Sequence, residues 1–233
     1  MACASEKMSH DWADTYKMFK ASGSELSSPS ETVIRLFKGN YVTGDVISSY
    51  AGKTGLDVGF GNGNNTFFLA SLGMDVSGVE IHQDICDAAS KDFERAGLQA
   101  DLRVGTNQSL PFDDNSFDYL LSWNVLHYEG SEEGIKAGLK EYSRVLKPNG
   151  RLFLSTTGPT HKILADSETL GGHRYKIGRA DDFRKGQVHF FFDSPDYIQF
   201  YFQDHFKELQ IGRIQDQLFN ETLDWWIVTG TKG

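Results

Sequence analysis

The sequence predicts an α/β fold in which a mostly parallel β-sheet carries helices on both faces. Two observations lead to this prediction: short β-type runs alternate with longer helical runs from Lys53 onward, and glycines follow the first β-type run at alternate positions. Successive strand–helix–strand units join parallel strands and place helices on both faces of the sheet. At 233 residues, the chain is long enough for one domain with a full hydrophobic core.

Composition narrows the class of protein. A hydrophobic content of 39% with 13% aromatic residues indicates a folded globule, and a net charge of -9 argues against a nucleic-acid partner. The N-terminus lacks the apolar stretch of a secretory signal, and no apolar run could span a membrane. The two cysteines, Cys3 and Cys86, provide no disulfide framework. We therefore expect a cytoplasmic protein.

The individual elements follow in chain order. Residues 10–21 and 30–38 are expected helices, separated by a loop rich in Ser, Gly and Pro. Five β-type runs come next, at 54–58, 75–80, 100–104, 119–123 and 151–156. Helical periodicity covers 64–72, 83–96 and 131–146 between them, and the last helix ends at a Lys-Pro-Asn-Gly stop signal.

The regular alternation stops after Thr157. Residues 158–192 show no clear period and contain five glycines, so we expect a long loop or insertion, which is usually functional or mobile. A helix should begin after Ser194, with Pro195 in its first position. Two terminal strands, 207–214 and 223–229, should complete the fold.

The stretch LDVGFGNGNN, residues 56–65, places a side-chain-poor turn between the first strand and its helix. In a parallel sheet this turn lies at the carboxyl edge, where helix amides and a bare backbone suit a nucleotide-like ligand. The second strand ends at Glu80, where a carboxylate can accept hydrogen bonds from ribose hydroxyls. A dinucleotide fingerprint would require glycine at position 64, where Asn64 stands, which weakens the case for NAD.

Several motifs in this order resemble the class I S-adenosylmethionine-dependent methyltransferases. They are Asp-x-Gly-x-Gly-x-Gly from Asp57, Glu80, LPFDDNSFDYLLSWNVLHY at 110–128 and EYSRVLKPNGRLFLST at 141–156. The resemblance implies a Rossmann-like class I methyltransferase fold, a seven-stranded sheet with an antiparallel terminal strand. It also implies S-adenosylmethionine as the cofactor and a small-molecule methyl acceptor.

The resemblance also assigns roles to particular residues. Glu80 would bind both ribose hydroxyls and Ile81 would pack on the adenine. The other expected cofactor contacts are Tyr16, Asp57, Gly59, Phe60, Gly61, Gly63, Thr106, Asn107, Gln108, Ser122 and Trp123. Many relatives carry an acidic residue where this chain has Thr106, so a hydroxyl or the Asn107 amide would have to bind the adenine amino group.

Methyl transfer is an in-line displacement, for which positioning can supply much of the rate. If the acceptor needs a base, His127 is the candidate, because it follows the fourth strand at the ligand-binding edge. A role in packing or hydrogen bonding near the cofactor is the favoured interpretation of this histidine.

Two segments would flank the site in a single domain of residues 1–233. Residues 1–40 would form a helical lid over the cofactor, although Trp12 and Tyr16 could equally pack in the core. Residues 158–192 would overhang the acceptor, and their Arg174, Arg179 and Arg184 would suit an anionic acceptor unless they are simply solvated.

Alternative functions remain open on sequence grounds. A binding protein that holds S-adenosylmethionine without catalysis would share these motifs, and an NAD-dependent oxidoreductase is a weaker candidate. His82 and Cys86 lie four residues apart but have no third ligand, so no metal site is expected. The acceptor, the atom methylated and the oligomeric state are not specified by the sequence.

Overall fold

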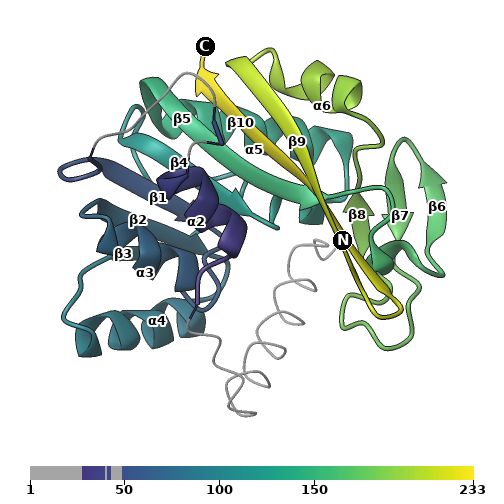
Figure 1. Cartoon of the computed structure of the whole chain (residues 1–233), viewed down its shortest axis with the longest axis horizontal. Coiled ribbons are helices and arrows are strands. Elements are labelled where there is room, and N and C mark those ends of the chain that lie inside the picture. Colours follow the sequence, from purple (N-terminus) through teal and green to yellow (C-terminus); the bar gives the residue numbers. More distant parts are fainter. Residues whose placement is uncertain (1–27, 40, 43–48) are drawn as a thin grey trace.

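The computed structural model describes residues 28–39, 41–42 and 49–233. Its centre is a seven-stranded sheet of order β3-β2-β1-β4-β5-β10-β9 (Figure 1). The strands are β1 (Thr54–Val58), β2 (Asp75–Glu80), β3 (Asp101–Val104), β4 (Phe117–Trp123), β5 (Leu146–Thr157), β9 (Phe206–Leu218) and β10 (Glu221–Lys232). The first five are parallel, and β10 is antiparallel to both neighbours, which confirms the fold predicted from the sequence.

Five α-helices and two short 3₁₀ helices accompany the sheet in the described part of the chain. They are α2 (Glu31–Lys38), α3 (Asn64–Ser71), α4 (Gln83–Arg95), η1 (Leu126–Glu129), α5 (Glu132–Val145), η2 (Lys162–Leu164) and α6 (Pro195–Phe202). The predicted cap of α6 is present, since the Ser194 hydroxyl accepts the Tyr197 N–H at 3.2 Å. Among the residues described, no helix has the length and apolar character needed to cross a membrane.

The sheet separates two hydrophobic cores because successive strand side chains point to opposite faces. Leu120 packs with residues of α5 and α6, including Leu139 and Phe202. Its neighbour Leu121 packs on the other face with Val33 and Phe37 of α2. The predicted site lies at the carboxyl ends of the parallel strands, between these two layers of helices.

The prediction of an irregular loop at 158–192 was wrong in part. The segment contains a three-stranded antiparallel sheet of β6 (Glu168–Gly171), β7 (Arg174–Lys176) and β8 (Val188–Phe190). Strands of three or four residues are too short to display an alternating pattern. The hairpin between β6 and β7 turns at Gly171 and Gly172, whose φ angles of 75° and 58° favour glycine.

The bounds of other strands differ from the prediction where pairing with a neighbour makes a strand longer. β5 begins at Leu146, directly after α5, and not at 151, because Leu146 pairs with Phe117 of β4. The terminal strands β9 and β10 are also longer than predicted and form a hairpin that reaches past the sheet (Figure 1). The helix predicted at 10–21 lies outside the described residues.

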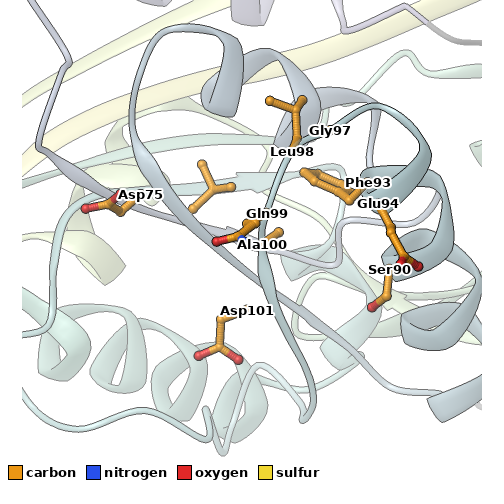
Figure 2. A pocket seen from close by; sticks show the side chains of 10 residues that line it. Asp75, Ser90, Phe93, Glu94, Gly97, Leu98, Gln99, Ala100 and Asp101 are labelled. Carbon is orange, nitrogen blue, oxygen red and sulfur yellow. The ribbon is translucent and has the colours of Figure 1, made fainter.

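A pocket of about 700 Å³ lies at the edge of the sheet opposite to the carboxyl ends of the parallel strands (Figure 2). Its lining includes Asp75 and Asp101, the first residues of β2 and β3, Phe93 and Glu94 from the end of α4, and Gly97 just after that helix. Because it adjoins the amino ends of the strands, this pocket is separate from the glycine turn.

Candidate functional site

The glycine turn joins β1 to α3 at the carboxyl edge of the sheet. Gly59 has a φ of 69°, and a Cβ built on it would lie 2.4 Å from a methyl carbon of Val125. A side chain here would therefore force apart the turn and the segment that follows β4. Gly63, with a φ of 77°, is the residue immediately before α3, so the helix amides begin at the turn.

Glu80 brings its carboxylate to the same turn. The side chain is 4% exposed and accepts the N–H groups of Gly61 at 2.9 Å and Ile81 at 3.0 Å. The acid at the end of β2 and the glycine turn after β1, far apart in the sequence, are therefore in direct contact. Each Glu80 oxygen accepts one of these N–H groups, and a carboxylate oxygen can accept a second hydrogen bond from a ligand hydroxyl, so these residues fit the ribose of S-adenosylmethionine.

Asp57 lies beneath the turn and is buried. Its carboxylate accepts the Thr66 hydroxyl at 2.7 Å. Burial raises the pKa of Asp57 to about 7, the Thr66 hydrogen bond opposes this rise, and the nearby charge of Glu80 adds to it. Asp57 thus supports the turn from below and can exchange a proton near neutral pH.

Phe60 and Ile81 flank the glycine turn differently. Phe60 is 6% exposed and packs with Ile85, Cys86 and Ala89 of α4, so its ring anchors the turn to that helix. Ile81 is half-buried directly after β2, where its side chain retains surface that a ligand could cover.

The loop after β3 is tied to η1 by hydrogen bonds. The Asn107 amide donates to Glu129 at 2.7 Å and its oxygen accepts the Tyr142 hydroxyl. Gln108 donates to the other Glu129 oxygen, while Thr106 is exposed and pairs with Ser109 through backbone hydrogen bonds. Burial raises the pKa of Glu129. The side-chain amide of Asn107 is therefore engaged within the protein.

The residues predicted at the end of β4 lie on opposite faces of the sheet. Ser122 is fully buried, with its hydroxyl 2.9 Å from that of Tyr142 on α5. Trp123 is half-buried and packs with the core that contains α2. Sequence reasoning did not identify Glu129 or Tyr142: Glu129 lies just beyond the motif at 110–128, and the motif at 141–156 contains Tyr142 without indicating its contact with Asn107.

His127 is buried in η1, at the edge of the site. It is 1% exposed, and burial lowers its pKa well below 6.5, with further lowering by His189 and Arg184. Its ring centre lies 4.8 Å from that of Tyr128 and 5.3 Å from that of His189. The insertion therefore packs against the candidate base through His189.

Arginines of the insertion are paired with acids. Arg179 contacts Asp181 and Glu221, each at 2.6 Å, and Arg184 contacts Asp182 at 2.7 Å. Arg174, the third arginine of the segment, donates to backbone carbonyls at the tip of β6. These contacts favour a structural role for the three guanidinium groups.

Two further rings, missed by sequence reasoning, lie near His127. His161 precedes η2 and Trp225 belongs to β10, and their ring centres are 4.4 Å apart. No sequence spacing could reveal this contact, which forms only when the last strand enters the sheet. Trp12 and Tyr16, the predicted lid residues, lie outside the described part of the chain.

Known families match the same region. The family model described as a methyltransferase domain matches residues 56–150, from β1 into β5. This stretch contains the glycine turn, Glu80 and His127.

Curated relatives match about half of the chain. The biotin biosynthesis bifunctional protein BioHC of Cellvibrio japonicus is 36% identical over 104 residues, which cover 45% of this chain and 20% of that protein. The demethylmenaquinone methyltransferase of Tropheryma whipplei is 37% identical over 115 residues, which cover 49% of this chain and 46% of that protein. The chain thus spans less than half the length of either relative.

Solved structures share the fold over a longer stretch. The 1,6-didemethyltoxoflavin-N1-methyltransferase of Burkholderia thailandensis, with 1,6-didemethyltoxoflavin and S-adenosylhomocysteine bound, matches with a TM-score of 0.66 at 16% identity. The match covers 100% of this chain and 92% of that one. At this identity the similarity establishes the fold alone.

Proposed function

We propose that this chain, which carries a methyltransferase domain of the class I S-adenosylmethionine-dependent family, is an enzyme. It would transfer a methyl group from S-adenosylmethionine to a small-molecule acceptor. The observation that carries the proposal is the Glu80 carboxylate held against the glycine turn. The turn lets a ligand approach the backbone closely, and the carboxylate provides hydrogen-bond acceptors. Both lie at the ligand-binding edge of the sheet.

S-adenosylmethionine, when bound, supplies a methyl group activated by a positively charged sulfur. The protein has to bind this cofactor and hold the acceptor in line. Glu80 would accept the ribose hydroxyls, and the turn from Gly59 to Gly63 would allow close approach of the amino acid end. The loop of Asn107 and Gln108 would border the adenine, with its conformation fixed by Glu129.

Positioning would carry most of the catalysis. Correct alignment of two reactants can contribute about 7–11 kcal/mol to a lowered barrier. His127 is neutral at pH 7 because burial lowers its pKa. The same lowering disfavours the protonated ring, so His127 is better suited to orienting the acceptor than to removing a proton from it.

The acceptor would lie beneath the insertion at 158–192. Of the predicted lid, residues 1–40, the part that forms α2 packs into the core, so a lid would be formed by the residues before it. We favour an uncharged acceptor over the anionic one that the basic insertion suggested, because Arg179 and Arg184 are paired with carboxylates. The Tropheryma whipplei relative is named for a small-molecule acceptor, which agrees with this class of substrate. A cytoplasmic location remains part of the proposal.

Calorimetry with S-adenosylhomocysteine tests the cofactor site. Glu80→Ala should weaken binding by about 1.5–3 kcal/mol, the range for hydrogen bonds to a charged group. Asp75→Ala is the matched control, because Asp75 starts the same strand at the opposite edge. Unchanged affinity in Glu80→Ala, with a normal melting temperature, would refute the assignment.

Two further measurements separate the alternatives. Transfer of a labelled methyl group to any acceptor distinguishes the enzyme from a protein that only binds S-adenosylmethionine. A thermal shift with NAD that exceeds the shift with S-adenosylhomocysteine would favour an oxidoreductase instead.

A further inference from the structure

Three buried histidines from distant parts of the chain meet beside the carboxyl edge of the sheet. His127 comes from η1, His161 from the start of the insertion and His189 from β8. Their side chains are 1%, 3% and 0% exposed, respectively. We refer to these three residues, with the neighbouring rings of Tyr128 and Trp225, as the histidine cluster.

Ring contacts hold the histidine cluster together. His189 lies 4.5 Å from Tyr128 and 5.3 Å from His127, measured between ring centres. Trp225 lies 6.4 Å from His127 and 4.4 Å from His161. Tyr128 and Trp225 are only partly buried, so they retain ring surface that a planar ligand could cover.

Each histidine leaves one buried ring nitrogen without a hydrogen-bond partner among the described residues. These atoms are Nδ1 of His127, Nε2 of His161 and Nδ1 of His189. The hydroxyl of Thr157, directly across the strand pair from Trp225, is buried and unpartnered as well. Unsatisfied buried polar atoms are costly and rare, and four of them in one place indicate a polar ligand.

The hydrogen bonds of His161 and His189 within the protein indicate which nitrogen of each ring carries the proton. Nδ1 of His161 accepts the Ile163 N–H at 3.1 Å, so the proton of the neutral ring sits on Nε2. Nε2 of His189 lies 3.1 Å from the Gln187 side-chain oxygen, so it carries the proton and Nδ1 is a bare acceptor. The cluster therefore contains one free hydrogen-bond donor, on His161, and one free acceptor, on His189.

The charges nearby are already compensated. Arg184 is paired with Asp182, and Arg213 with Asp224, at 2.7 Å in both cases. Each guanidinium group already has a carboxylate partner, so neither is free to attract an anionic ligand. A ligand of the cluster should therefore be uncharged and satisfy the free donor and acceptors.

We infer that the histidine cluster binds the methyl acceptor, and that this acceptor is an uncharged planar ring bearing a hydrogen-bond donor and an acceptor, as in a lactam or a cyclic imide. The ring lies against Trp225 and Tyr128, receives the His161 Nε2–H and donates to His189 Nδ1. This assignment rests on the proposed methyltransferase function, and it specifies the class of substrate for the same site.

Two substitutions remove the free nitrogens while keeping the internal hydrogen bonds. His161→Asn places an amide oxygen near the former Nδ1, which preserves the contact with the Ile163 N–H. His189→Gln places an amide nitrogen near the former Nε2, which preserves the contact with Gln187. His205→Gln is the control, since His205 precedes β9 at the opposite edge of the sheet.

The probes are uracil and 2-pyridone, which are neutral, with orotate as the anionic counterpart of uracil and N-methyl-2-pyridone as the analogue without a donor. Binding is measured by saturation-transfer NMR and calorimetry on the full chain, with and without saturating S-adenosylhomocysteine. The neutral donor–acceptor probes should bind in preference to both analogues. His161→Asn and His189→Gln should each weaken them about fivefold to tenfold, whereas His205→Gln should not.

Melting temperatures separate this role from a structural one. Loss of an unsatisfied buried atom should leave the stability of the free protein unchanged or raised. A lower melting temperature with unchanged probe affinity would show that the histidines only pack, and would overturn the assignment. Preference for orotate, or no binding of any probe up to its solubility, would overturn it as well.

Failure of the acceptor assignment is distinguishable from failure of the proposed function. Absence of S-adenosylhomocysteine binding contradicts the methyltransferase proposal, whatever the probes do. Normal S-adenosylhomocysteine binding together with any of the negative probe results contradicts only the acceptor class.

Discussion

The carboxyl of Asp57 links the stability of the glycine turn to pH. Its folded-state pKa of about 7 exceeds the ordinary value of 3.8, so the folded state retains a proton that the unfolded chain releases. The contribution of Asp57 to the free energy of unfolding should therefore be greatest below pH 4. It should fall as the pH rises toward 7, by as much as about 4 kcal/mol. Chemical denaturation across this range should show the dependence in the wild type.

Asp57→Asn isolates the contribution of this carboxyl. Its free energy of unfolding should lack that downward slope between pH 4 and 7, so the difference from the wild type should change with pH. Thr66→Val removes the hydrogen bond that lowers the pKa, and should extend the slope to higher pH. Parallel curves for wild type and Asp57→Asn would contradict a raised pKa.

The histidine cluster should have the opposite dependence on pH. Burial lowers the pKa of His161 to about 4 and that of His189 to about 3, so both rings are neutral in the folded state at pH 7. Their contribution to stability should be complete above pH 6.5 and be lost as the pH falls through these values. NMR titration of the ring protons should show no transition of either histidine near pH 6.5.

Arg184 supplies the check on this titration. Its charge is among the causes that lower the pKa of His127, His161 and His189. Arg184→Gln should therefore move the transitions of all three rings upward. Transitions that stay in place would show that Arg184 has no electrostatic effect on the cluster.

The sequence predicted only part of the site at this scale. Glu80 and the glycine turn could be placed because both follow strands whose ends meet at one edge of a parallel sheet. The contacts of His127 with His189, and of His161 with Trp225, depend on how the insertion folds back and on the position of β10. Spacing along the chain carries no information on either contact.

Among the secondary-structure elements, β10 anchors the insertion by a buried carboxylate. Asp224 has a side chain that is 0% exposed, and it accepts hydrogen bonds from the Thr160 N–H, the Thr160 hydroxyl and Arg213. Asp224→Ala should lower the free energy of unfolding by about 2–3 kcal/mol, because it leaves the donors unpaired. Because His161 follows Thr160, the variant should also weaken binding of neutral probes.

Glu221→Ala is the matched comparison on the same strand. Glu221 joins the insertion to β10 through Arg179, but its side chain is 39% exposed. An ion pair open to solvent contributes little, so denaturation curves should be close to those of the wild type. Equal destabilisation by the two substitutions would contradict the importance of the buried anchor.

Elements with clear end signals were predictable, and the short strands of the insertion were not. The runs that became β1, β2, α3 and α4 carry a full period and clear end signals, so their bounds agree with the prediction within one residue. β6, β7 and β8 are three or four residues long and owe their pairing to the hairpin turn and to contact with η1. Tertiary contacts, and not local propensity, define them.

For the whole molecule, the role of the N-terminal segment can be tested by truncation. Val33 and Phe37 of α2 are 0% and 4% exposed and belong to one of the two cores. Deletion of residues 1–28 leaves α2 intact, so the melting temperature should change little. If the segment acts as a lid, methyl transfer should fall far more than stability.

The control for the truncation is α2 itself. Phe37→Ala in the full-length chain should lower stability by about 3–5 kcal/mol, because a large buried ring is lost. Parallel losses of turnover and stability in the truncated protein would indicate that the segment serves only the core.

The place of β10 also constrains how the protein can be made. It follows every other strand of the sheet along the chain, yet it lies between β5 and β9. A nascent chain on the ribosome must therefore keep one side of β5 open until β10 has emerged, and an open strand edge invites aggregation. Trp225 belongs to this strand. A polypeptide terminated before β10 would therefore lack one of the rings proposed to contact the acceptor, even if its glycine turn were complete.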